Sequence, residues 1–105
     1  MDESGESVRI VDWLATRVPA PPAALARIIA GYVDQVECDM QALPDHLVDA
    51  AMRILNSLRD GRESANDLLA ADALVTYAVE ASAEQGDHEF PMQAAVRLAN
   101  VRVNQ

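Results

Sequence analysis

Two histidines, His46 and His88, are the side chains of this 105-residue chain best suited to proton or phosphoryl chemistry near neutral pH. His46 lies near the start of a segment with helical periodicity, and it shares the polar side of that segment with Asp49, Arg53 and Asn56. An exposed histidine on a helix could act as a phosphoacceptor. The simpler interpretation of the same position is a solvated surface histidine.

The segment HLVDAA, residues 46–51, is similar to the reactive segment of histidine phosphotransfer domains. Those domains are small acidic four-helix bundles with a phosphoaccepting histidine on one helix, so the resemblance implies a helical bundle in which His46 accepts phosphate. The chain departs from that pattern at two positions. Asp49 stands where the family usually has a lysine, and Ala50 stands where it has a glycine. The carboxylate of Asp49 would repel a phosphorylated imidazole.

His88 lies in the acidic segment QGDHEF, with Asp87 and Glu89 beside it and Glu84 one turn earlier. Imidazole and carboxylate groups suit zinc or manganese. However, the sequence has neither a Glu-x-x-His nor a His-x-x-x-His pair, the spacings that place two ligands on one helical face. We therefore expect a solvated loop, with no metal and no cofactor.

Nucleophilic catalysis finds little support in the sequence. Cys38, the one cysteine, is flanked by Glu37 and Asp39, which raise a thiol pKa instead of activating the thiolate. A nucleophile elbow has glycines on both sides of its serine. Such glycines are missing around Ser57, Ser64 and Ser82. We expect the protein not to be an enzyme.

The stretch RDGRESAND, residues 59–67, combines arginines and a glycine ahead of a helical segment. Gly61 can supply a positive φ after one helix, and Ser64 with Asp67 approximates a capping box for the next. A phosphate-binding loop usually contains more glycines and a lysine, and Glu63 and Asp67 would repel an anion. The stretch therefore predicts an interhelical turn.

Composition excludes several functions. The formal charge is -9, with all cations supplied by arginine, so the surface would repel nucleic-acid phosphates and anionic lipid. A single cysteine excludes an intrachain disulfide. The first residues, MDESGES, do not resemble a secretory signal, and no apolar run approaches the ~20 residues of a membrane span. We expect a cytoplasmic protein that binds neither nucleic acid nor membrane.

The elements that would position these side chains are all helical. Half of the residues are apolar and only 4% are aromatic, with much alanine, which favours closely packed helices. Apolar residues recur at spacings of three and four, which predicts helices, and prolines and glycines mark where these helices end. The pattern predicts five helices and no strand. The expected fold is a compact all-α bundle in one domain, residues 7–105, after a disordered start at 1–6. The predicted helices cover residues 7–18, 22–43, 45–60, 66–85 and 91–103.

The last two predicted helices have more apolar surface than one small bundle can bury. In the fourth, apolar residues cover more than half of the circumference, which predicts a central helix or one that shares a side with another chain. The fifth has two apolar sides. A possible interface on these two helices comprises Leu69, Ala73, Leu74, Tyr77, Ala81, Met92, Val96, Ala99 and Val103.

The function expected from these features is a non-catalytic interaction module or subunit. Its partner would be a protein, either another chain or a second copy in a homodimer. The alternative is a ligand-binding or histidine phosphotransfer-like module, because the same apolar excess could line a pocket.

Overall fold

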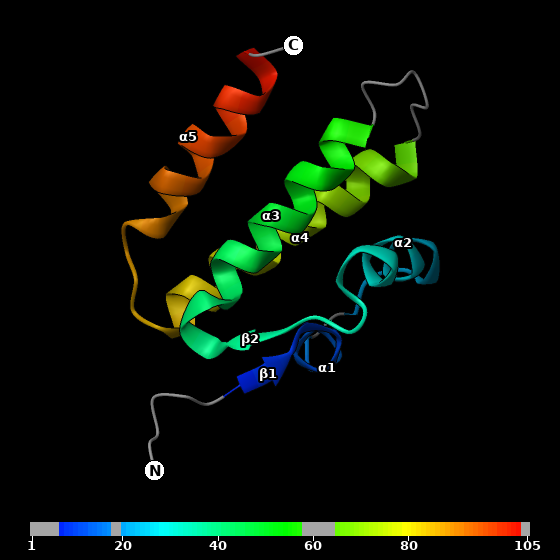
Figure 1. The fold of residues 1–105 in the computed structure, drawn as a ribbon, viewed down its shortest axis with the longest axis horizontal. Coiled ribbons are helices and arrows are strands. Elements are labelled where there is room, and N and C mark those ends of the chain that lie inside the picture. The colour runs from blue at the N-terminus through cyan, green and yellow to red at the C-terminus, as the bar shows by residue number, and fades with distance from the viewer. Residues whose placement is uncertain (1–6, 18–19, 58–64, 104–105) are drawn as a thin grey trace.

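The computed structural model describes residues 7–17, 20–57 and 65–103, with side chains as far as residue 100. It confirms the compact all-α bundle, whose overall dimensions are 47 × 29 × 22 Å. In Figure 1, α3 and α4 run antiparallel through the middle, with α5 on one side and α2 on the other. The helices of the described part are α1 (Ile10–Leu14), α2 (Ala23–Val33), α3 (Leu43–Ser57), α4 (Ala65–Glu84) and α5 (Phe90–Val103).

The core is centred on the contact between α3 and α4. Fully buried large residues include Leu47 and Ile54 of α3 and Leu74 of α4. Small buried residues, such as Ala51 and Ala78, lie among them, and small side chains allow two helices to approach closely. The predicted fourth helix is therefore central, and α3 shares that position because it contacts α2, α4 and α5.

The prediction that the chain has no strand is wrong. Strands β1 (Ser7–Arg9) and β2 (Glu37–Asp39) form an antiparallel pair, with Val8 opposite Cys38. The backbone N–H of Ile10 then donates to the carbonyl of Val36 at 3.1 Å. The first helix consequently begins at Ile10, since the residues expected in its first turn pair with β2 instead.

The second predicted helix is too long, because α2 ends at Val33. Asp34 leaves helical geometry with ψ 137°, and Gln35 adopts a φ of 70° in the left-handed region. A 3₁₀ turn, η2 (Met40–Ala42), then leads from β2 into α3. Met40 and Leu43 continue the apolar spacing of the second helix in the sequence, but they belong to η2 and α3.

The predicted end of the fourth helix is confirmed in detail. Gly86 has a φ of +76°. The N–H of Asp87 donates to the Ser82 carbonyl at 2.9 Å, and the N–H of Gly86 donates to the Ala83 carbonyl at 3.0 Å. These two bonds form a Schellman motif, which satisfies carbonyls that a helix end leaves free.

Asp87 also fixes the start of the last helix. Its carboxylate accepts hydrogen bonds from the backbone N–H groups of Glu89, at 3.1 Å, and Phe90, at 3.2 Å. An aspartate that caps backbone donors stabilises the first turn of a helix. The four residues from Glu84 to Asp87 thus set the path of the chain between α4 and α5.

Two predictions concern segments outside the described residues: the disordered start at 1–6 and the turn at 59–64. Among the helices that the structure describes, none combines the length and the apolar character needed to cross a membrane.

Candidate functional site

The two apolar sides predicted for the last helix have different environments. Phe90 and Ala94 face the rest of the chain and are buried, at 4% and 2% exposure. On the opposite side, Met92 is 74% exposed, Val96 is 55% exposed, and Ala99 is exposed as well. We call Met92, Val96 and Ala99 the outer face of α5. The side chain of Val103, also predicted there, lies outside the described part.

Polar contacts hold the middle of α5 to α3. The guanidinium of Arg97 donates to the carboxylate of Asp49 and lies 3.8 Å from that of Asp45. The side chain of Arg97 is 37% exposed, and those of Asp49 and Asp45 are 52% and 68% exposed, so water and salt screen these pairs. The buried attachment of α5 is therefore made near its start, by Phe90 and Ala94.

Three of the residues predicted for the interface lie in the core of their own chain. Leu74, Tyr77 and Ala81 are 0%, 8% and 2% exposed, because α2 and α3 pack against that side of α4. Ala73 is half-buried against the same core. These positions are not available to a partner in this structure, which corrects their assignment to a surface.

Leu69 does remain on the surface, at 52% exposure, beside Leu68 at 49%. Both leucines lie near the start of α4. The start of α5 lies near the other end of α4, as the antiparallel path of the chain requires (Figure 1). At a rise of 1.5 Å per residue, most of the length of α4 separates these leucines from Met92. The leucines and Met92 therefore do not form one continuous patch.

His46 is half-buried in the first turn of α3, and its imidazole makes no hydrogen bond or ion pair with another described residue. Its neighbours Asp45 and Asp49 face Arg97. The guanidinium is thus already engaged by carboxylates. Asp49, one turn from His46, is therefore a carboxylate engaged by Arg97, not a lysine that could hold phosphate.

The remaining candidates for chemistry stay apart. His88 is exposed in the turn between α4 and α5, and the described residues include no group of three metal-ligating side chains. Cys38 is half-buried in β2, where burial and then the carboxylate of Asp39 raise the pKa of its thiol. A raised pKa keeps the thiol protonated and unreactive at neutral pH.

A contact that the sequence did not predict centres on Arg17. Its guanidinium lies 4.1 Å from the centre of the Trp13 ring and pairs with the carboxylates of Glu84, at 2.8 Å, and Glu80, at 3.5 Å. Trp13 in turn meets Tyr77 edge to face, with 6.4 Å between ring centres. Arg17 and Trp13 therefore tie the start of the chain to α4. The spacing of four residues between them was visible in the sequence, but the glutamates lie 63 and 67 residues further on.

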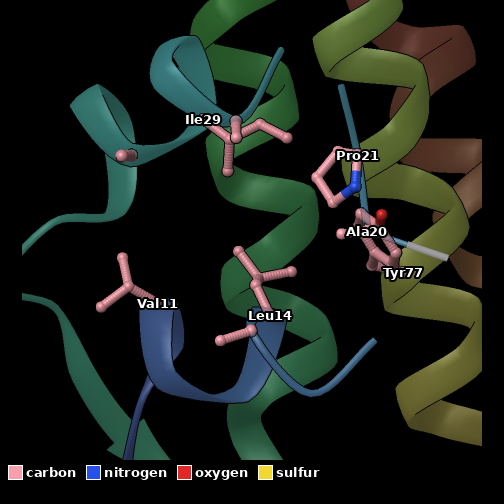
Figure 2. Close-up of a pocket in the computed structure, with 9 residues that line it drawn as sticks. Val11, Leu14, Ala20, Pro21, Ile29 and Tyr77 are labelled. Carbon is pink, nitrogen blue, oxygen red and sulfur yellow. The ribbon is translucent and has the colours of Figure 1, made fainter. Parts of the chain in front are cut away.

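An apolar pocket of about 260 Å³ lies between α1, residues 20–21, α2 and α4. Figure 2 shows Val11 and Leu14 of α1 below, Ile29 of α2 above, and Pro21 and Tyr77 to the right. Alanines complete the wall at positions 15, 20, 26 and 30. Among these described lining residues, only Tyr77 has a side chain that ends in a polar group. Tyr77 belongs to the apolar surface that the sequence predicts for an interface or a pocket, whereas the other lining residues do not.

Comparison with protein-family models, curated proteins and solved structures finds no match to this chain.

Proposed function

We propose that the protein is a small non-catalytic interaction module that forms a homodimer through the outer face of α5. The observation that carries this proposal is the exposure of Met92 and Val96 on a helix whose opposite side already docks on the core. A helix with two apolar sides can bury the second one against another chain. No catalytic group enters the proposal, and a cytoplasmic location accords with the single reduced cysteine.

The distribution of charge supports a second copy as the partner. The chain carries a formal charge of -9, yet residues 90–105 contain two arginines and no acidic residue. Two acidic proteins repel each other least when they meet through their least acidic surfaces. An α5 to α5 contact joins two segments of net positive charge and leaves the acidic parts of the two copies outside the contact.

The shape of the outer face also suits a symmetric contact. Met92, Val96 and Ala99 recur at spacings of four and three, so they form a stripe along one side of the helix. In a twofold dimer the same stripe serves both copies, with Met92 of one copy near Ala99 of the other. Methionine adapts its shape to such a contact because its side chain is unbranched and flexible.

Sedimentation velocity over a range of protein concentrations tests the proposal. The test variant carries Met92→Glu and Val96→Glu, which place two carboxylates on the outer face without removing a buried group. The control variant carries Ala24→Glu and Gln41→Glu, which add the same charge at exposed positions of α2 and η2. Circular dichroism of each variant reports whether the helices are retained.

We expect the wild type and the control to be dimers and the test variant to be a folded monomer. A wild-type protein that remains monomeric at its highest soluble concentration would contradict the proposal. A test variant that dimerises as well as the control would move the interface to another surface, with the exposed Leu68 and Leu69 as the next candidates.

A further inference from the structure

The apolar pocket next to Tyr77 has the properties of a binding site for a small molecule, independently of the outer face of α5. We propose that it binds an uncharged amphiphile of about ten non-hydrogen atoms, with an apolar body and one hydrogen-bonding group directed to the Tyr77 hydroxyl. Size, lining and charge each restrict the ligand.

The volume limits the size of the ligand. An apolar cavity of ~150 Å³ holds a benzene molecule, and pockets for drug-sized ligands begin at ~300 Å³. The volume of about 260 Å³ falls between them. Val11, Leu14 and Ile29 supply branched aliphatic surface, so the body of the ligand must be apolar to replace water there favourably.

Tyr77 supplies the polar end of the site. The residue is 8% exposed, and its hydroxyl has no hydrogen-bond partner among the described residues. Every fully buried side-chain oxygen or nitrogen of the described part has a hydrogen-bond partner. Because the Tyr77 hydroxyl has none, it is not fully buried and is accessible from outside the protein. Since Tyr77 lines the pocket (Figure 2), a ligand hydroxyl or carbonyl could pair with it.

The charges beside the pocket select against anions. Burial raises the pKa of Tyr77 most, the charge of Glu80 raises it further, and the charge of Arg17 lowers it. The Arg17 guanidinium is already paired with Glu84 and Glu80 and covers the ring of Trp13. A carboxylate on the ligand would therefore meet the negative charge of Glu80, while the Arg17 side chain is already paired. The resulting preference is for an alcohol over the corresponding acid.

Trp13 provides the readout, because it is the one tryptophan of the chain and contacts Tyr77. The probe is 1-octanol, with sodium octanoate as the charged analogue of equal chain length. We expect saturable changes in Trp13 emission with octanol, at a Kd on the order of 0.1 mM. Octanoate should bind at least ~10-fold more weakly, by the cost of placing a charge in an apolar site.

Two substitutions on α2 locate the site. Ala26→Leu adds three carbons at the pocket wall, whereas Ala24→Leu adds the same group at an exposed position that does not line it. Both residues are exposed, and leucine is a good helix former, so both variants should fold. We expect Ala26→Leu to weaken octanol binding by at least ~10-fold and Ala24→Leu to leave it unchanged.

A third variant tests the polar end. Tyr77→Phe removes the hydroxyl alone and should weaken octanol binding by roughly 3–10-fold, the worth of one hydrogen bond.

The proposal is overturned if Trp13 emission shows no saturable response, or if Ala26→Leu and Ala24→Leu bind octanol equally. Amide shifts in ¹H–¹⁵N spectra provide the last check. Octanol should shift the amide resonances of the residues that line the pocket. Shifts confined to Met92 and Val96 would overturn the assignment, because octanol would then bind at the outer face of α5.

Discussion

Helices α4 and α5 look alike in sequence, since each carries more apolar surface than one contact requires, but the structure treats them differently. The apolar side of α4 is covered from within the chain, by α2 and α3. Leu74, Ala78 and Ala81 are essentially inaccessible there. Helix α5 buries Phe90 and Ala94 but leaves Met92 and Val96 to solvent.

The position of each helix along the chain explains the difference. α4 runs antiparallel to α3, which precedes it in the chain, and α2 also packs against α4. Helix α4 therefore has neighbours on two sides (Figure 1). Among the described elements, α5 makes its main contacts with α3 and α4. A wide apolar side on a helix therefore predicts a surface that is buried by a neighbour. Which element or chain buries it depends on the topology of the fold.

The strongest way to separate the two helices is to truncate one large side chain on each. Leu74→Ala should lower the free energy of unfolding by about 3 kcal/mol, because it leaves a cavity in the α3 to α4 contact. Met92→Ala should change it by less than ~0.5 kcal/mol in the monomer, since that side chain is 74% exposed. Urea unfolding at low protein concentration measures both. Equal losses would mean that α5 is as deeply packed as α4.

Enlarging a small residue gives an intermediate effect. Ala78 is fully buried, so Ala78→Leu should cost about 1–3 kcal/mol by overpacking the contact between the central helices. Ala99→Leu extends the exposed outer face of α5 and should leave the monomer almost unaffected. Thermal unfolding followed by circular dichroism gives the comparison. A well-tolerated leucine at position 78 would contradict the close approach of the central helices.

The smallest expected difference in the free energy of unfolding is between removal of Arg17 and removal of Arg97. Arg17→Ala removes both the cation–π contact with Trp13 and the pair with Glu84, for a cost of about 1 kcal/mol. Arg97→Ala removes more exposed pairs with Asp45 and Asp49 and should cost less than ~0.5 kcal/mol. Only the second effect should largely vanish in 1 M salt. An Arg97 variant less stable than the Arg17 variant at high salt would reverse this ranking.

The helices with strong local signals could be predicted from the sequence, and the remaining errors have a non-local origin. Gly86 ends α4 because glycine accepts a positive φ, and that signal is local. The end of α2 depends on Gln35, which adopts a φ of 70° without being a glycine. The strand pair joins Val8 to Cys38, thirty positions apart, and each strand is too short to show an alternating pattern.

The candidate surfaces were predictable to a similar extent. The spacing of Met92, Val96 and Ala99 places them on one side of a helix, and the structure leaves that side exposed. The same reasoning applied to Leu74 and Tyr77 could not show that α2 and α3 cover them. The pocket was beyond reach because its wall combines α1, α2 and α4, whose relative placement no local pattern encodes.

Hydrogen exchange of the wild-type protein at two concentrations tests most directly the claim that α5, unlike α4, is completed by a second copy. In the dilute protein, amides of α5 should exchange faster than those of α3 and α4, because fewer buried contacts hold that helix. Raising the concentration should slow exchange in Phe90–Val103 first, since association stabilises the helix that it covers. Exchange in α5 that stays the same at both concentrations, or that already equals exchange in α4 when dilute, would contradict the account.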